Sequence, residues 1–147
     1  MLLRQIKEQD IPVLVEFEKE ISLISFGKDA ITDTNFHAKR LLKSFEKDPE
    51  GMLVMTNENI ICGWVWLDKK INFLTQENYI NFRSLYVPEE YRGSEVCDSL
   101  MEACLEYCRA VNAKQMIGKV HIDNIPMRAL YKKFNFKATH ITMEYEV

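Results

Sequence analysis

The sequence predicts an α/β protein built on a mixed β-sheet that is flanked by helices. One observation behind this prediction is a run from Tyr79 to Ile122 that reads as strand, turn, helix and strand. Such a run implies parallel strands joined by a right-handed crossover. The other is a pair of short apolar segments before it, joined by a polar turn, which implies antiparallel pairing. With the flanking segments, the expected element order is β-α-α-β-β-β-α-β-α-β.

The first third of the chain is expected to form one strand and two helices. Leu2 to Ile6 reads as the strand. Asp10 is typical of a residue that precedes a helix, and Pro12 is tolerated in a first helical turn, where a missing N–H costs little. After Gly27, a second amphipathic helix is expected from about Asn35 to Glu46. The apolar residues at helical spacing in the first helix are Val13, Leu14, Phe17 and Ile21.

A β-hairpin is expected after Gly51. Its strands are Met52 to Met55 and Ile60 to Leu67, and the turn between them is Asn57 to Asn59. The second strand is almost wholly apolar, which favours a central strand that is covered on both faces. A polar connection from Asp68 to Asn78 follows.

The second half of the chain alternates strands and helices. Tyr79 to Val87 reads as a strand, and the turn after it leads into a helix from about Ser94 to Asn112. A strand from Met116 to Ile122 and a helix from Ile125 to Phe134 come next. The last expected strand is Ala138 to Glu146, in which apolar residues alternate at Ile141, Met143 and Tyr145.

Length and composition indicate one globular domain that spans residues 1–147. The chain has 47% hydrophobic and 28% charged residues, which suffices for a core without cross-links. The formal net charge of −3 gives no electrostatic reason to expect nucleic acid or an anionic membrane as a partner. No apolar run approaches the roughly 20 residues that span a bilayer. The segment Met1 to Gln5 lacks the features of a secretion signal.

The cysteines suggest a reducing compartment, so we expect a cytoplasmic protein. Their spacing matches neither a paired zinc-binding pattern nor a secreted disulfide framework, and no metal is expected. Three of them form a stripe with Met101 at helical spacing, which favours core packing over a metal or redox site. The cysteines are Cys62, Cys97, Cys104 and Cys108.

The turn from Tyr91 to Cys97 joins the end of a strand to the start of a helix. Several backbone N–H groups lack partners at such a junction, and the helix dipole favours an anion there. The turn is therefore able to hold a phosphate group without any special side chain. A plain crossover with no ligand is the alternative reading of this turn taken alone.

Two segments resemble motifs of the GNAT N-acyltransferases. The segment Asn124–Phe136, N-I-P-M-R-A-L-Y-K-K-F-N-F, is similar to the family's N-x-x-A-x-x-L-Y-x-K-x-G-F. The segment Leu85–Gly93, L-Y-V-P-E-E-Y-R-G, looks like its L-x-V-x-P-E-Y-R-G. Both lie in the family's order and at about its usual separation, and the expected element order also matches. The motifs cover Leu85 to Phe136, and the topology covers most of the chain.

The resemblance implies an N-acetyltransferase that moves an acetyl group from acetyl-CoA to an amine by direct attack in a ternary complex. Asn124 would hold the pantetheine arm or brace the strands. Arg128, with Lys132 and Lys133, would either meet the 3′-phosphate of CoA or form a solvated basic face of the helix. Tyr131 would protonate the leaving thiolate, since a phenol stays protonated at neutral pH. Backbone groups of Leu85, Tyr86 and Val87 would bind the pantetheine arm, and the pyrophosphate would lie on the amides of Arg92, Gly93, Ser94, Glu95, Val96 and Cys97.

The phosphate-binding turn departs from the family pattern, in which glycines let the backbone approach the pyrophosphate. Here Glu95 and Cys97 occupy the glycine positions. Glu95 adds bulk and a like charge, and it either occupies the anion site or swings outward and leaves the amides free. A catalytically impaired binding or regulatory module on the same fold is therefore the alternative function.

The general base is not evident from the sequence. The positions where many family members carry a carboxylate correspond to Arg83 and Lys119, and both are cationic. His121 shares a strand face with Lys119 and has a suitable unperturbed pKa. A partly buried structural histidine and a water chain to solvent are the alternatives.

The amine acceptor is also left open, and antibiotics, polyamines, amino acids and protein N-termini all remain candidates. By topology, the segment Ser25–Phe36 would shape the acceptor pocket, with Lys28, Asp29 and Asp33 as candidate contacts. Trp64 and Trp66 would lie either in the core or along the acceptor site. Small proteins of this fold also form homodimers through sheet edges or last strands, so a homodimer is kept open.

Overall fold

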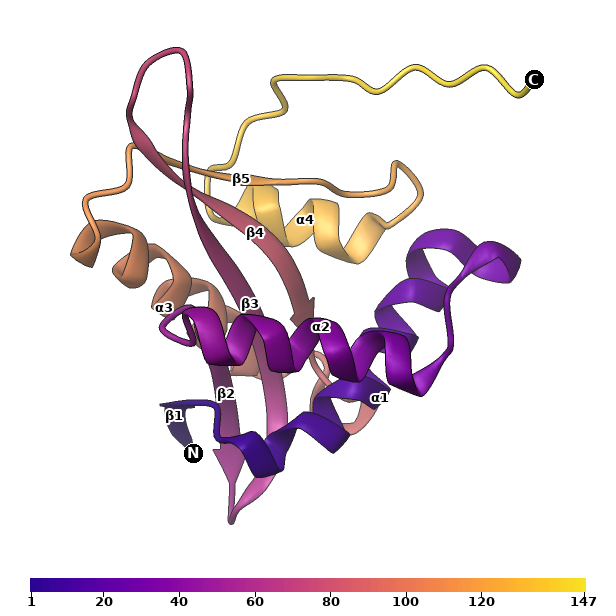
Figure 1. The fold of residues 1–147 in the computed structure, drawn as a ribbon, viewed down its shortest axis with the longest axis vertical. Coiled ribbons are helices and arrows are strands. Elements are labelled where there is room, and N and C mark those ends of the chain that lie inside the picture. The colour runs from indigo at the N-terminus through magenta and orange to yellow at the C-terminus, as the bar shows by residue number, and fades with distance from the viewer.

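A computed structural model describes all residues 1–147 and contains one five-stranded sheet in the order β1-β2-β3-β4-β5. The first four strands pair antiparallel, whereas β4 and β5 pair parallel. The strands are β1 (Leu2–Gln5), β2 (Met52–Asn57), β3 (Ile60–Ile71), β4 (Asn78–Tyr86) and β5 (Gln115–Gly118). The α-helices are α1 (Ile11–Phe26), α2 (Thr34–Lys47), α3 (Val96–Ala110) and α4 (Ile125–Lys133). The mixed α/β sheet flanked by helices that the sequence predicts is confirmed (Figure 1).

Helices cover both faces of the sheet, and each face has its own core. The core on the side of α1 and α2 contains Trp64 and Trp66, both fully buried. The core on the side of α3 and α4 contains Cys104, Cys108 and Met101, so this cysteine stripe packs as the sequence predicts. Both faces of β3 are therefore covered, as its apolar sequence indicates. None of the helices is both long and apolar enough to cross a membrane.

A β-bulge between β3 and β4 decides where the polar side chains of β4 point. Trp66 lies opposite Ser84, whereas Leu67 lies opposite Phe82, so Arg83 is the extra residue. The guanidinium of Arg83 lies 3.7 Å from the centre of the Trp66 ring. Because Trp66 belongs to the core under α1 and α2, the bulge turns both Arg83 and Ser84 toward that face.

In the first half of the chain, the predicted helices and strands are confirmed, with boundaries that differ by a few residues. The hairpin turn has Glu58 at φ 50° and Asn59 at φ 67°, the left-handed angles that a tight hairpin requires. Strand β3 runs on to Ile71, four residues beyond Leu67, because it continues to pair with β4. Val13 is 42% exposed, so it lies off the buried stripe of α1 that includes Leu14 and Val15.

The expected last strand, Ala138 to Glu146, is not a strand in this structure. The segment is extended but pairs with no other strand, and it projects away from the sheet (Figure 1, yellow). The side chains of Ile141, Met143 and Tyr145 are 85%, 86% and 90% exposed. Alternation of apolar residues shows that a segment suits a sheet, but a ladder also needs an edge to pair with. Strand β5 likewise ends at Gly118, short of the predicted Ile122.

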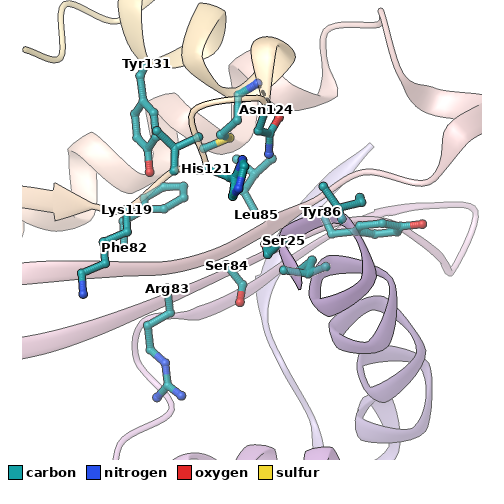
Figure 2. A pocket seen from close by; sticks show the side chains of 14 residues that line it. Ser25, Phe82, Arg83, Ser84, Leu85, Tyr86, Lys119, His121, Asn124 and Tyr131 are labelled. Atoms are coloured by element: carbon teal, nitrogen blue, oxygen red, sulfur yellow. Dashed lines mark hydrogen bonds between the residues drawn. The ribbon is translucent and has the colours of Figure 1, made fainter. Parts of the chain in front are cut away.

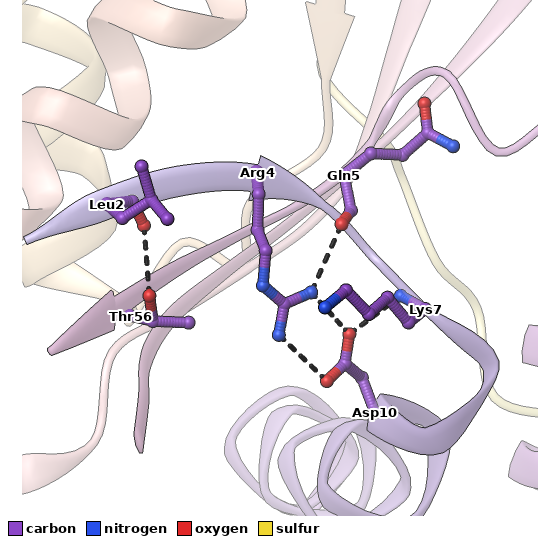
Figure 3. Close-up of polar contacts among 6 residues, drawn as sticks. All are labelled: Leu2, Arg4, Gln5, Lys7, Asp10 and Thr56. Atoms are coloured by element: carbon purple, nitrogen blue, oxygen red, sulfur yellow. Dashed lines mark hydrogen bonds and ion pairs between the residues drawn. The ribbon is translucent and has the colours of Figure 1, made fainter. Parts of the chain in front are cut away.

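An ion pair ties the first strand to the start of α1 (Figure 3). Both guanidinium Nη atoms of Arg4 donate to the carboxylate of Asp10, at 2.7 and 3.0 Å. The backbone N–H of Lys7 donates to the same carboxylate at 2.7 Å. Asp10 thus precedes the helix as predicted, but its side chain reaches backward to β1 and makes no bond to the first turn of α1. The hydrogen bonds from Arg4, which have the largest effect, and from Lys7 lower the pKa of the Asp10 carboxyl.

We expect Asp10→Asn to lower the free energy of unfolding by about 2 kcal/mol at neutral pH, because hydrogen bonds to charged groups contribute about 1.5–3 kcal/mol each. Since the folded-state pKa is lowered, the ionised carboxylate stabilises the protein at neutral pH, and this contribution is lost as the pH falls through that lowered value. The difference between wild type and variant in urea denaturation should therefore shrink in acid. Glu8→Gln, at an exposed neighbouring position, is the control and should show no such difference.

Candidate active site

Strands β4 and β5 separate halfway along β4. Their parallel pairing ends at Phe82 and Gly118, so the rest of β4 pairs only with β3. A cavity of about 110 Å³ opens at this point (Figure 2). Four parts of the chain line it: Ile21, Ile24 and Ser25 of α1, residues 82–86 of β4, residues 119–121 after β5, and Asn124, Met127 and Tyr131 of α4.

Side chains from both faces of the sheet line the cavity. Figure 2 shows Tyr131 and Asn124 on one side of β4, whereas Ser84 and Arg83 point to the other side. The first side is that of α4, and the second is that of α1.

Tyr131 projects from α4 into the separation of the strands. It is 9% exposed, and its ring packs against those of Phe82 and Phe136. Burial raises the pKa of Tyr131 to about 12, so the phenol keeps its proton throughout the neutral range. A Cβ atom at Gly118 would lie 2.0 Å from the phenol oxygen, so only glycine leaves room for this hydroxyl. The structure therefore places a protonated, confined phenol at the cavity wall.

Asn124 sets the start of α4. Its side-chain oxygen accepts from the backbone N–H of Met127 at 3.2 Å, which caps the helix. Its backbone N–H donates to the carbonyl of His121 at 2.9 Å, so the loop from β5 is held against the helix. Arg128 donates to the carbonyl of Ile122 at 2.8 Å and is exposed on the same helix. These bonds orient the helix that carries Tyr131.

His121 lines the cavity but its ring is already engaged. The backbone N–H of Asp123 donates to Nδ1 at 3.1 Å. In the neutral ring this bond leaves the proton on Nε2, so the lone pair that a base needs is occupied. The side chain is also 51% exposed. This geometry does not favour His121 over other proton acceptors.

The turn before α3 presents free backbone donors. Within it, the amides of Arg92 and Ser94 donate to turn carbonyls, and that of Val96 donates to the Ser94 hydroxyl. Gly93 adopts φ 77°, a left-handed angle that suits glycine. The amides without a protein acceptor are those of Gly93, Glu95, Cys97 and Asp98. Clustered free amides at a helix start form a site for an anion.

The two unusual residues of this turn leave those amides open. Glu95 is exposed and its carboxylate caps no amide of α3, so it does not occupy the site that those amides form. Cys97 is half-buried against the core of α3, and burial raises the pKa of its thiol. Arg92 donates from Nε to the carbonyl of Val87 at 2.9 Å and lies near the Tyr86 ring, which fixes the turn to the end of β4.

The cations of the cavity differ in their surroundings. Arg83 is paired with Asp68 at 2.8 Å, whereas Lys119 is exposed and forms none of the ion pairs in the structure. Of the candidate acceptor-site residues, Ser25 lines the cavity, but Lys28, Asp29 and Asp33 do not. Asp33 instead caps α2 by accepting from the Asn35 amide at 2.9 Å.

Sequence reasoning missed two polar residues beside the cavity. Ser84 lines it, and its hydroxyl donates to the carboxylate of Glu18 at 3.1 Å. Glu18 is 5% exposed and also accepts from Trp64 Nε1 at 2.9 Å. One signal was available: Glu18 follows Leu14 by four residues and precedes Ile21 by three, so it interrupts an apolar helical stripe.

Comparisons with known proteins agree on one family. The model of the "Acetyltransferase (GNAT) family" matches residues 16–136. A protein of Bacillus subtilis (strain 168) named "Putative [ribosomal protein bS18]-alanine N-acetyltransferase" is 29% identical over 97% of this chain and 84% of its own length. An "N-alpha-acetyltransferase" of Saccharolobus solfataricus is 35% identical over 63 residues, 42% of this chain and 38% of its own length.

Solved structures share the fold at low sequence identity. A mutant of the BH1408 protein from Bacillus halodurans has a TM-score of 0.84 at 19% identity, covering 100% of this chain and 99% of that one. An acetyltransferase of Trypanosoma brucei has a TM-score of 0.73 at 17% identity, covering 99% of both chains. With a family model that matches most of its length, this chain belongs to the GNAT family of acetyltransferases.

Proposed function

We propose that this protein is an acetyl-CoA-dependent N-acetyltransferase that acts by direct attack of an amine on the thioester in a ternary complex. The observation that carries the proposal is the cavity where β4 leaves β5, with Tyr131 at its wall and free amides at the start of α3. In this proposal residues 1–147 form one catalytic domain.

The proposed donor site uses backbone groups for most of its contacts. The pantetheine arm would lie along the unpaired edge of Leu85 and Tyr86, as an added strand lies on a sheet edge. The pyrophosphate would meet the free amides of Gly93, Glu95 and Cys97. Val87 contributes less than the sequence suggests, because its carbonyl already accepts from Arg92. Asn124 braces the loop, and Arg128 is exposed where it would meet the 3′-phosphate.

The proposed reaction needs no covalent enzyme intermediate. The amine nitrogen attacks the thioester carbon, a C–N bond forms, and the C–S bond breaks to release CoA thiolate. The Tyr131 phenol gives its proton to that thiolate, and the tyrosinate regains a proton from the nitrogen that has attacked. A buried phenol with a pKa of about 12 suits this role, because it is fully protonated at neutral pH.

The alternative, a non-catalytic module on the same fold, receives less support. It rested on Glu95 in the phosphate turn and on the cations Arg83 and Lys119, but the Glu95 carboxylate bonds to none of the turn amides, which remain free. Cys97 is directed toward the core of α3. The turn thus keeps the donors that a pyrophosphate needs although it lacks the glycines.

We propose the α-amino group of a protein or peptide as the acceptor. Two relatives support this choice by their names, one a ribosomal-protein alanine N-acetyltransferase and the other an N-alpha-acetyltransferase. An acceptor of this kind carries a cationic amine at the end of an extended chain, and that end would enter the cavity beside Ile21, Ile24 and Ser25 of α1. We place the protein in the cytoplasm, since all its cysteines are free thiols.

We also propose a homodimer in which the extended segment 138–146 pairs with the sheet of a second copy. The segment has one fully exposed apolar face, and β5 has an open edge in the five-stranded sheet. Such a pairing would bury the apolar face of the segment and give the open edge of β5 a hydrogen-bonding partner.

Titration calorimetry tests the donor site. We expect acetyl-CoA to bind with micromolar affinity, and Glu95→Gly to tighten binding less than threefold, because the native carboxylate is exposed and bonds to no turn amide. Tightening of tenfold or more would show that Glu95 obstructs the turn. Absence of heat and of thermal stabilisation at millimolar acetyl-CoA would refute the proposed function.

Replacement of Tyr131 tests the acid. We expect Tyr131→Phe to lower kcat about 100-fold in a thiol-release assay, with acetyl-CoA affinity unchanged, because the substitution removes only the phenol hydroxyl, which supplies the proton. Wild-type activity should show no alkaline loss from Tyr131 near neutral pH, since its pKa is about 12. Phe134→Leu, at the end of the same helix, is the control. Unchanged turnover in Tyr131→Phe would exclude this tyrosine as the acid.

Light scattering on a size-exclusion column tests the dimer. We expect the wild-type protein to elute as a dimer, and Ile141→Asp with Met143→Asp to elute as a monomer, because the charges would lie on the apolar face of the segment. Thr142→Asp, on the opposite face of the same segment, should stay dimeric. A monomeric wild-type protein at micromolar concentration would contradict the proposal.

A further inference from the structure

Glu18 is a buried carboxylate without a cationic partner. Its side chain is 5% exposed and its two oxygens accept from neutral donors, the Trp64 indole at 2.9 Å and the Ser84 hydroxyl at 3.1 Å. It takes part in none of the ion pairs of the structure. A buried charge is costly unless an opposite charge or enough hydrogen bonds compensate it. A cation that arrives with a ligand would therefore offset the free-energy cost of burying the Glu18 carboxylate.

Glu18 lies on α1, behind the residues of this helix that line the cavity. Ile21 and Ser25 line the cavity and follow Glu18 by three and seven residues, so all three lie on one face of the helix. On the opposite side, Ser84 lines the cavity and holds Glu18 through its hydroxyl. Figure 2 shows that hydroxyl on the face of β4 away from Tyr131, which is the face from which the acceptor would approach.

The charged groups around Glu18 do not neutralise it directly. Arg40 of α2 is the cation whose charge acts on it, but Arg40 lies over the rings of Phe36 and Trp66 and makes no hydrogen bond to the carboxylate. Arg83 of β4 is already paired with Asp68 of β3. Neither arginine therefore forms an ion pair with the Glu18 carboxylate.

We infer that Glu18, acting through Ser84, holds the ammonium group of the acceptor and receives its proton. The inference rests on the proposed function and supplies the proton acceptor that neither Arg83 nor Lys119 offers. An N–H bond of the ammonium breaks as its proton passes to Ser84 Oγ, and the hydroxyl proton passes along the existing hydrogen bond to Glu18 Oε1. The nitrogen keeps the electron pair and attacks the thioester carbon. Glu18 later returns the proton to solvent through Ser84.

A purely structural role is the competing explanation, because Glu18 also ties α1 to β3 and β4. The two roles differ in what they predict for the acceptor. A structural tie affects folding and all ligands alike. A counter-charge affects only a cationic acceptor, and a proton acceptor changes the pH dependence of its acetylation.

The test compares Glu18→Gln and Ser84→Ala with wild type. Glu20→Gln, an exposed carboxylate two residues along the same helix, is the matched control. One probe is a short peptide with a free N-terminal alanine, and the other is the same peptide with a hydroxyl in place of the α-amino group. Calorimetry in the presence of CoA gives both affinities, calorimetry with acetyl-CoA alone monitors the donor site, and kcat/KM for the amino peptide is followed against pH.

We expect both variants to bind acetyl-CoA like wild type. The preference for the amino over the hydroxy peptide should fall at least tenfold in Glu18→Gln, and kcat/KM should recover as the pH rises and the free amine forms in solution. Ser84→Ala, which removes only a hydroxyl, should show the same recovery and keeps the test informative if Glu18→Gln folds poorly. Glu20→Gln should match wild type throughout.

Two outcomes would overturn the inference, and they are distinguishable. If the wild-type protein acetylates the peptide while both variants keep its preference and its pH profile, Glu18 is only a structural tie. If the wild-type protein binds no acetyl-CoA or acetylates no amino peptide, the proposed function fails and the inference falls with it.

Discussion

The separation of β4 from β5 after Phe82 and Gly118 is the constraint on which the rest of the site depends. Where two parallel strands part, the peptide groups between them lose their ladder partners and become available to a ligand. Two local features maintain the separation. The Tyr131 hydroxyl occupies the space beside Gly118 that any larger residue would fill, and the bulge at Arg83 turns the end of β4.

The two faces of the sheet carry different functional groups beside this separation. The face of α3 and α4 carries the free amides and the confined phenol, which suit an anionic donor and its thiolate leaving group. The face of α1 carries Ser84 and the buried Glu18, which suit a cationic acceptor. The two sets of side chains come from opposite faces of the sheet and lie on either side of β4.

Sequence reasoning found the elements of this site well and its side-chain environments poorly. It placed three features within a few residues of their observed positions: the strand, turn and helix that end in α3, the helix with Asn124 and Tyr131, and the hairpin at Asn57. These features follow from local periodicity and turn chemistry. It missed Ser84 and Glu18, which are 66 positions apart in the chain and are joined only by the packing of α1 on β4. It also predicted a last strand at 138–146, where the apolar alternation is real but no neighbouring strand is present.

By itself, the sequence determined the order of helices and strands as far as α4, the parallel crossover around α3 and the two motifs that resemble the GNAT family. These features depend on residues that are close in the chain, so their physics is local. Only the tertiary structure decided that the Glu95 carboxylate bonds to no turn amide, that His121 Nδ1 is already hydrogen-bonded and that Tyr131 is confined beside Gly118. Each of these depends on the direction of a side chain relative to a distant or neighbouring backbone, which periodicity and composition do not specify.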